Sequence, residues 1–286
     1  MPELPEVETI ARSLRGENPP RATAVFRDGI APASIVGRAI RSADVLWEKT
    51  IAAPQTGFKD RIAGRRVASV GRRAKFLALG LDQDVLVIHL RMSGDLLVRP
   101  AGEPPALHDR VVFHFEDGFD LAFNDTRKFG RVWLLDDPEE LFAGLGPEPL
   151  GDAFTPDWFF EKLQTRSRQI KPLLLDQSFL AGVGNIYADE SLHRAGIHPL
   201  RSSHSIDRSE ARALWGHLRD VLEESIRNNG ASIDWVYRGG DFQNVFRVYG
   251  RAGEACTSCG GAIERIVVGQ RGTHLCPNCQ PETDPA

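Results

Sequence analysis

The four cysteines of the chain form two Cys-x-x-Cys pairs near its C-terminus, a pattern typical of a metal site. Cys256 and Cys259 make the first pair, Cys276 and Cys279 the second, and sixteen residues separate the pairs. Two such pairs can supply four thiolates to one tetrahedral zinc ion, and closed sites of this kind are structural. The alternatives are a redox dithiol or two disulfides. Because a reducing cytosol disfavours disulfides and a redox motif needs only one pair, we expect one structural Zn²⁺ per chain and no organic cofactor.

The N-terminus places a secondary amine beside a carboxyl group. Pro2 follows Met1, and removal of the initiator methionine would leave the proline nitrogen as a free secondary amine. Glu3 comes next, so its carboxyl group lies beside that amine through the covalent chain. The alternative is that Pro2 and Glu3 only lead into a capped surface helix, in which the positive end of the helix dipole favours Glu6. Taken alone, the start of the chain favours this alternative.

The same stretch predicts the helix that would hold these groups. Pro5 suits the first position of a helix, where the N–H that proline lacks would have no partner. The apolar residues behind it follow the i, i+3, i+4, i+7 spacing of an amphipathic helix, namely Val7, Ile10, Ala11 and Leu14. Such a helix would fix the first residues against a core.

The charge of the chain is negative in sum but unevenly distributed. With 35 Lys and Arg against 39 Asp and Glu, the formal net charge is −4, which by itself argues against a nucleic-acid partner. Residues 61–81, however, contain six basic residues and no acidic one, namely Arg61, Arg65, Arg66, Arg72, Arg73 and Lys75. Residues 162–171 add four more basic residues without an acid. A run of charge is commonly only a solvated face, so each segment alone is weak evidence for phosphate contacts.

Neither a membrane helix nor a signal peptide is expected. The sequence has no apolar run of the length that a bilayer requires, and its first ten residues contain three glutamates. We therefore expect the protein to stay in the cytosol.

The elements between these motifs predict a multidomain α+β protein. Short β-branched runs separated by turn residues indicate antiparallel sheets that close as a two-sheet sandwich over 2–135. Residues 136–154, acidic and rich in proline, are expected to form a linker. A helical domain is predicted over 155–248 and a cysteine-containing domain over 249–282.

Local signals place three helices in the second half. Thr155–Pro156 combines an N-cap with a proline at the first helical position, and Lys171–Pro172 opens another helix. Asp207 and Glu210 form a capping box before a long helix.

Two further segments could bind anions. Gly182 and Gly184 precede a helix start and leave backbone N–H groups free to converge on an anion, to which Asn185 adds a side-chain donor. Between the cysteine pairs, a predicted hairpin carries Arg271 at its tip, where it could reach a phosphate. A tight turn at the glycines and an arginine that serves only solubility are the alternatives.

Together these motifs resemble the formamidopyrimidine-DNA glycosylase family. The resemblance rests on Pro-Glu-Leu-Pro-Glu-Val-Glu-Thr after Met1, on the glycine–Asn segment and on the four-cysteine hairpin with Gln270–Arg271, in this order. It implies an N-terminal β-sandwich, a helix–two-turn–helix module and a zinc finger. The implied activity is base-excision repair: removal of oxidised purines such as 8-oxoguanine and formamidopyrimidines from double-stranded DNA, followed by β,δ-elimination at the abasic site. A monomer is expected.

The resemblance also implies roles for catalytic residues. Pro2 corresponds to the nucleophile, because a secondary amine that attacks C1′ gives a charged iminium without losing a second proton. Glu3 would protonate the sugar ring oxygen, and Glu6 would stabilise the developing cation. Lys75 corresponds to a lysine that assists β-elimination, and Arg271 to a residue linked to δ-elimination.

Further residues match DNA-contact positions of the family. Those expected on the phosphate backbone and bases are His108, Arg127, Arg166, Lys171 and Asn185. Met92, Arg127 and Phe129 resemble the three residues that fill the space left by a flipped nucleotide. Without the resemblance, a core methionine and a strand phenylalanine would be the preferred interpretation.

Two departures from the family pattern and two competing functions remain. Residues 15–32 look like an insertion, and the loop after Asp234 looks shortened where a longer loop covers the flipped purine. An enzyme of the endonuclease VIII branch, which acts on oxidised pyrimidines, would share Pro2, but it typically has glycine where Leu4 stands here. A non-catalytic zinc protein that binds damaged DNA is the second alternative.

Overall fold

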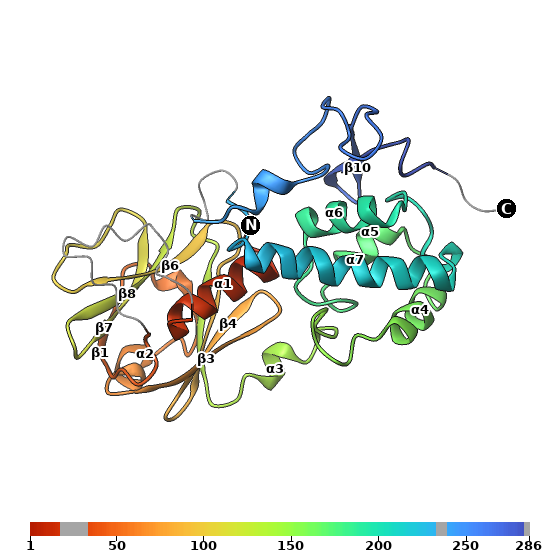
Figure 1. Cartoon of the computed structure of the whole chain (residues 1–286). Helices are drawn as coiled ribbons and strands as arrows, with labels where there is room; N and C mark the ends of the chain where they lie inside the picture. Colours follow the sequence, from red (N-terminus) through yellow and green to blue (C-terminus); the bar gives the residue numbers. More distant parts are fainter. Residues whose placement is uncertain (18–33, 233–238, 283–286) are drawn as a thin grey trace. The chain divides into compact units, whose positions relative to one another are not determined.

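The computed structural model describes residues 1–17, 34–232 and 239–282 (Figure 1). Contacts divide the chain into two compact units, Met1–Ala143 with Asn228–Asp241, and Gly144–Arg227 with Phe242–Ala286. The first unit therefore includes a segment that is distant in sequence. Because this division differs in kind from three consecutive domains and a linker, the domain boundaries given above stay a prediction. Among the described residues, no helix is both long and apolar enough to cross a membrane.

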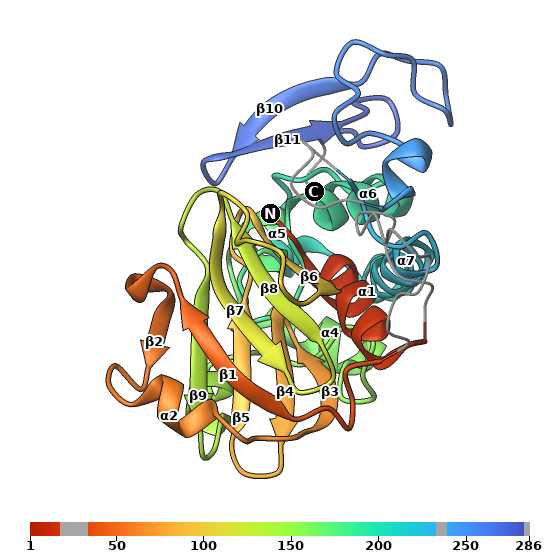
Figure 2. The same ribbon diagram turned by 90° about the vertical axis from the view of Figure 1, so that its left-hand side faces the viewer.

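The first unit is a β-sandwich, as predicted, and Figure 2 shows its two sheets face to face. One sheet has the order β1-β7-β8-β6, formed by Ile40–Val45, Asp109–Phe115, Phe119–Asp125 and Gly94–Pro100. The other has the order β2-β9-β5-β4-β3, formed by Ile51–Ala53, Arg131–Leu135, Val85–His89, Phe76–Leu81 and Val67–Arg73. The sheets are antiparallel, as expected, except that β2 pairs with β9 in parallel. The chain enters β2 through the 3-10 turn Glu48–Thr50 instead of a hairpin, so an antiparallel direction is not imposed.

Alternation along the strands explains why the sheets pack together. In β8, Leu121 and Phe123 point into the shared apolar core, and in β7 Val111, Phe113 and Phe115 do the same. A strand presents every second side chain to one face, so these residues form a continuous apolar layer against the facing sheet.

Helix α1 (Leu4–Arg15) closes one side of the sandwich and packs against β3 and β4. The four residues that predicted it, Val7, Ile10, Ala11 and Leu14, are all buried in the same core. Gly16 ends the helix in a left-handed conformation, with φ of 79°. The start of the chain is therefore anchored along its whole first helix. The short helix α2 (Phe58–Ile62) adds Phe58 to this core.

The predicted linker is partly structured. Residues Glu139–Phe142 form helix α3, and the Phe142 ring packs edge-on against Phe76 of β4 at 5.6 Å between ring centroids. An aromatic contact of this kind attaches the end of the first unit to its own sheet.

The second unit contains α4 (Pro156–Gln164), α5 (Ile170–Leu174), α6 (Asn185–Ala195), α7 (Arg208–Arg227), the 3-10 turns Ser203–Ser205 and Phe242–Val245, and the hairpin β10 (Glu264–Val268) with β11 (Arg271–Leu275). The Thr155 hydroxyl accepts the Trp158 N–H at 3.1 Å, which confirms the predicted N-cap. Asp207 and Glu210 cap each other's backbone N–H groups at 2.8 and 2.9 Å, which confirms the capping box before α7.

Candidate functional site

Pro2 precedes the first turn of α1, where the carboxyl groups of Glu3 and Glu6 lie. Glu3 is the N-cap residue, and its carboxylate accepts the backbone N–H of Glu6. In return, Glu6 Oε2 accepts the backbone N–H of Glu3 at 2.8 Å. Pro2 is buried, Glu3 is 3% exposed and Glu6 is 2% exposed, whereas Met1 is half exposed. The helix therefore fixes the residue after Pro2 on both its backbone and its side chain, while the Pro2 nitrogen is an amide as long as Met1 is attached.

The second oxygen of Glu6 holds a distant segment. Glu6 Oε1 accepts the backbone N–H of Ala231 at 2.8 Å. Gly230, beside it, has a φ of +79°, and a Cβ atom there would lie 2.9 Å from the same oxygen. Only glycine allows this close approach, so the Glu6 carboxylate joins the chain start to residues 230–231. This contact explains why Asn228–Asp241 belongs to the first unit.

Lys75 lies in the two-residue turn between β3 and β4 and is 6% exposed. Arg72 Nη1 donates to the carbonyl of Ala74 at 2.9 Å, and Arg72 Nε pairs with Glu8 of α1 at 3.2 Å. Burial by itself would raise the pKa of Glu8, but hydrogen bonds from Arg12, Arg72 and Arg15 lower that pKa below its ordinary value. The ionised Glu8 thus links the helix that carries Pro2 to the turn that carries Lys75.

His89 is a candidate that the sequence interpretation did not assign. It lies opposite Phe76 in the β4–β5 pair, with the two rings edge to face at 4.5 Å. Burial, together with the charges of Arg91 and Lys75, lowers the pKa of His89 to about 3. Its Nδ1 accepts the Arg91 N–H at 2.9 Å, so the neutral ring has its proton on Nε2. The only sequence signal was a histidine three residues before Met92.

Met92, Arg127 and Phe129 lie at two tight turns of the first unit. Met92 is 38% exposed and Phe129 is 47% exposed, which is unusual for apolar residues of this size. The Arg127 guanidinium lies over the Phe129 ring at 5.1 Å. His108, at the start of β7, is partly exposed. The interpretation of Met92 and Phe129 as core residues is therefore excluded.

Several of these side chains share one backbone feature. A non-glycine residue in the left-handed region, with φ between 52° and 63°, directly precedes four candidate residues. The pairs are Ala74 before Lys75, Arg91 before Met92, Lys128 before Phe129 and Gln270 before Arg271.

In the second unit, Lys171 is fully buried. Its Nζ pairs with Asp189 at 2.6 Å and donates to the Thr273 hydroxyl at 2.7 Å and to the Gly272 carbonyl at 3.3 Å. A direct DNA contact from Lys171 does not fit this placement, because the ammonium group is enclosed and already holds three oxygens. The role of Lys171 in DNA binding stays a prediction, and its placement favours an indirect role, through the hairpin.

Asn185 and Gly272, the residue after Arg271, belong to the same network. Asn185, the first residue of α6, donates its Nδ2 to the Gly272 carbonyl at 2.9 Å, and Asp189 Oδ2 accepts the backbone N–H of His274 at 2.9 Å. Gly272 follows Arg271, whose side chain is exposed. Helices α5 and α6 therefore hold the strand that begins with Arg271. Arg166 is also exposed, over the Phe179 ring at 5.6 Å.

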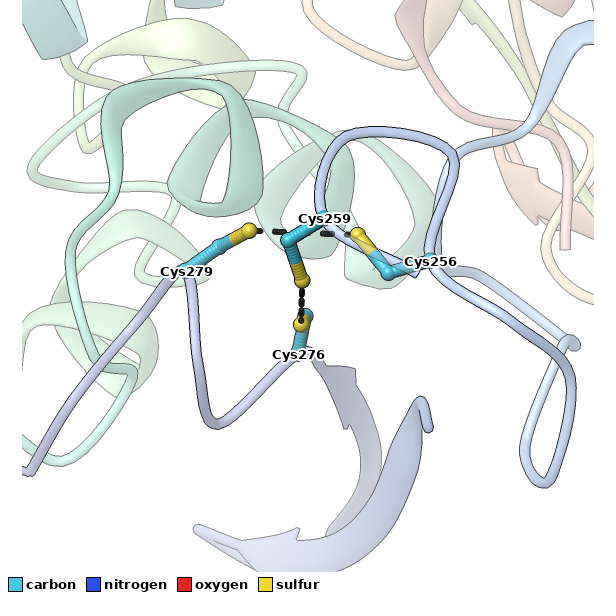
Figure 3. Close-up of side chains that lie close together, drawn as sticks. All are labelled: Cys256, Cys259, Cys276 and Cys279. Atoms are coloured by element: carbon cyan, nitrogen blue, oxygen red, sulfur yellow. Dashed lines mark hydrogen bonds between the residues drawn. The ribbon is translucent and has the colours of Figure 1, made fainter. Parts of the chain in front are cut away.

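The four cysteine sulfurs point toward one another, as Figure 3 shows. All lie within 4.8 Å of one another, with 3.4 Å between Cys259 and Cys276 and 3.8 Å between Cys256 and Cys279. Four sulfurs bound tetrahedrally at about 2.3 Å from zinc would be about 3.8 Å apart, so the donor set fits this ion.

The electrostatics of the thiols agree with a cation at their centre. Burial opposes ionisation of Cys256, yet backbone N–H groups and the His193 ring, whose Nε2 lies 3.4 Å from the sulfur, lower its pKa to about 6. Burial and the neighbouring sulfurs raise the pKa of Cys279. Four thiols at this distance can all be thiolates only around a metal ion, and the protein has one structural zinc site.

Comparison with known proteins agrees with this arrangement. Models of the N-terminal domain and of the H2TH domain of formamidopyrimidine-DNA glycosylase match residues 22–132 and 145–236, and a zinc finger found in FPG and IleRS matches 253–281. The chain is 46% identical to formamidopyrimidine-DNA glycosylase of Herpetosiphon aurantiacus, over 98% of this chain and 100% of that protein. The chain belongs to the formamidopyrimidine-DNA glycosylase family.

Other members of the family are similar over the same length. The formamidopyrimidine-DNA glycosylase of Chloroflexus aggregans is 45% identical over 98% of both chains. Among solved structures, Lactococcus lactis Fpg (MutM) in complex with Fapy-dG-containing DNA gives a TM-score of 0.87 at 34% identity, covering 98% of this chain and 100% of that one. A MutM complex with DNA that contains carbocyclic 8-oxo-G gives the same values. Of the two departures from the family pattern, residues 18–32 of the apparent insertion and residues 235–238 of the shortened loop lie outside the described residues.

Proposed function

We propose that the protein excises oxidised purines from DNA through a covalent intermediate on Pro2 and then cleaves the strand at the resulting abasic site. Family membership supports the substrate class and both activities. Relatives of the same length have been captured on DNA containing 8-oxo-G, Fapy-dG or an abasic site. The single observation that carries the mechanism is the capping box of α1, which buries Glu3 and Glu6 beside Pro2.

The chemistry follows from the order of these groups. Once Met1 is removed, the Pro2 nitrogen attacks C1′, and the bond from C1′ to the base breaks. The base leaves with the electron pair of that bond and takes up the proton that the nitrogen loses. The Glu3 carboxyl gives a proton to the ring oxygen O4′, the sugar ring opens, and the nitrogen is left as an iminium. An α-amino group ordinarily has a pKa of about 8, so a substantial fraction of such amines is neutral and nucleophilic at physiological pH. Glu6, whose carboxyl group accepts the Glu3 N–H, would stabilise the positive charge.

The iminium then makes strand cleavage possible. The iminium at C1′ withdraws electrons and so makes the C2′ proton more acidic. Removal of that proton expels the 3′-phosphate in β-elimination. Lys75 would bind a phosphate of the lesion strand and assist this step. Arg271 would bind the 5′-phosphate that leaves in the subsequent δ-elimination. Lys171 and Asn185 would act on this second step by holding the strand that begins with Arg271.

The exposed residues of the two turns account for recognition of duplex DNA. Met92 and Phe129 would occupy the space left by the flipped nucleotide, while Arg127 would hydrogen-bond the base opposite it. His108 and Arg166 would contact phosphates. Because these contacts are with phosphates, the affinity for DNA should fall steeply as the salt concentration rises, despite the negative net charge of the protein. We place the enzyme in the cytoplasm, on the nucleoid when bound to DNA, as a monomer.

Borohydride trapping tests the proposal most directly. Reduction of the iminium should give a covalent complex of the mature enzyme with a duplex that contains 8-oxoguanine or an abasic site. Pro2→Gly, and a form in which an N-terminal tag retains Met1, should give little or no complex while still binding DNA. If the mature enzyme gives no complex on either duplex, the proposed chemistry is wrong.

Substrate choice separates the two branches of this chemistry. Excision should be faster on 8-oxoguanine opposite cytosine than on thymine glycol. Exclusive activity on thymine glycol would favour an endonuclease VIII-like enzyme instead.

A further inference from the structure

We propose that Asp125 is a positioning residue that joins the Met92 turn and the Arg127–Phe129 turn into one rigid wedge. This inference rests on the proposed function, in which both turns enter the duplex. Asp125 is the last residue of β8 and is fully buried. It does not belong to the group of residues around Pro2.

The carboxylate of Asp125 bonds both turns at once. Its Oδ1 accepts the hydroxyl of Ser93, the residue after Met92, and the backbone N–H of Arg127 at 3.2 Å. Its Oδ2 accepts the backbone N–H of Gly130, after Phe129, at 2.8 Å. Ser93 Oγ in turn accepts the Arg127 N–H at 3.0 Å. Residues adjacent to Met92 and Phe129, and the backbone of Arg127 itself, thus share one buried carboxyl group.

The backbone of Asp125 extends the same connection to His108. Its N–H donates to the carbonyl of His108 at 2.9 Å, and its carbonyl accepts Arg110 Nε at 2.7 Å. Arg110 is 7% exposed and its Nη2 lies 3.4 Å from His108 Nδ1. The turn residues Met92, Arg127 and Phe129, together with His108, are therefore connected through Asp125.

Packing beneath the carboxylate leaves little room for independent movement. A Cβ atom on Gly130 would lie 2.3 Å from the Phe123 ring, and one on Gly94 would lie 2.8 Å from the same ring and 2.5 Å from the Leu90 carbonyl. One glycine from each turn thus rests against one buried ring. Because the ring supports both turns and the carboxylate ties them together, a displacement of either turn must move the other.

A rigid wedge has a specific consequence for the reaction. To fill the space left by the flipped nucleotide, Met92 and Phe129 must enter the duplex together with Arg127. If the two turns moved apart, the extruded nucleotide would be stabilised less well. Asp125 should therefore affect extrusion of the lesion and discrimination of the opposite base. It should not affect attack by Pro2 on a sugar that has already lost its base.

The test compares Asp125→Asn with Asp120→Asn. Asp120 lies in the same strand and is 2% exposed, but it faces His114 instead of the two turns. An amide cannot accept N–H or O–H bonds at both of its ends, so Asp125→Asn breaks at least one link. Single-turnover excision of 8-oxoguanine opposite cytosine should fall about ten- to a hundredfold in Asp125→Asn, the scale expected for a small misplacement. Asp120→Asn should stay within about threefold of wild type.

Two further measurements separate positioning from general damage. Cleavage and borohydride trapping on a preformed abasic duplex should change much less than excision in Asp125→Asn, and the preference for cytosine over adenine opposite the lesion should shrink. Equal losses on both substrates, or an unchanged excision rate, would overturn the inference. If the wild type excises nothing, the proposed function fails instead.

Ser93→Ala provides a milder variant if Asp125→Asn does not fold. It removes the hydroxyl that joins the two turns and keeps the carboxylate. The effects of Met92→Ala and Arg127→Ala on excision should be strongly non-additive in the wild type and closer to additive in the Ser93→Ala background. Non-additivity that is the same in both backgrounds would contradict a shared wedge.

Discussion

Replacement of Lys171 by methionine should destabilise the second unit strongly. The burial of Lys171 and of its partner Asp189 sets the size of the expected loss. Both Lys171 and Asp189 have side chains that are 0% exposed, and their charged atoms are 2.6 Å apart. Removing one member of such a pair leaves a charge that water cannot reach. The usual cost is about 3–5 kcal/mol of unfolding free energy. Methionine fills a similar volume, so a cavity should add little to this loss.

An exposed ion pair in the same unit supplies the control. Arg208 and Asp157 form a salt bridge in which the side chains are 63% and 75% exposed. Arg208→Met should therefore cost less than about 1 kcal/mol. Urea unfolding followed by circular dichroism would measure both variants. Hydrogen exchange at the amides of Gly272 and His274 would show whether the Lys171→Met loss reaches the hairpin.

The double variant Lys171→Met with Asp189→Leu tests whether the loss of stability comes from the unpaired buried charge. It removes both charges but also takes away the acceptor of the His274 N–H, which donates to Asp189 in the wild type. The remaining loss should then be about 1–3 kcal/mol, smaller than that of Lys171→Met alone. A loss below about 1 kcal/mol in the single variant, or a double variant less stable than the single, would refute a buried, paired Lys171.

Three other predictions concern separate parts of the site. Glu6→Gln keeps the volume but cannot accept both the Glu3 and Ala231 N–H groups, so the rate of iminium trapping should fall by about tenfold or more, while DNA affinity measured by fluorescence anisotropy holds. His89 has a folded pKa of about 3, below its unfolded value of about 6.5, so its contribution to stability is complete above pH 6.5 and is lost as pH falls toward 3. His89→Gln should flatten this part of the acid unfolding curve, and the same change at the exposed His204 should leave it as in the wild type. Cys256→Ser should reduce zinc content and weaken DNA binding, and unchanged zinc by atomic absorption with unchanged affinity would count against the four-cysteine site.

Features that depend on neighbouring residues in the sequence could be predicted well. The first helix, the Thr155 cap, the Asp207–Glu210 box and the cysteine pairs each follow from spacings of a few residues, and the structure confirms all of them. Their physical causes are local: periodicity, capping and ligand geometry.

Contacts between distant residues could not be predicted in the same way. Lys171 stands in a basic segment and was expected to contact DNA, but it is buried against Asp189 of α6 and Thr273 of β11. The contact of Glu6 with Ala231 crosses 225 positions of sequence. Nothing in the local pattern distinguishes a lysine that will be buried from one that will meet DNA. The family resemblance could not supply this distinction either.

The left-handed residues before Lys75, Met92, Phe129 and Arg271 have a consequence for how the enzyme meets a distorted duplex. Glycine would adopt these backbone angles without the strain of about 1–2 kcal/mol that a side chain brings. Glycine would also give the unfolded chain, and a loosened turn, many more conformations. By keeping alanine, arginine, lysine and glutamine at these positions, the protein accepts strain and gains stiffness. Each of these turns has thus given up much of its freedom before DNA arrives, so less entropy remains to be lost on binding.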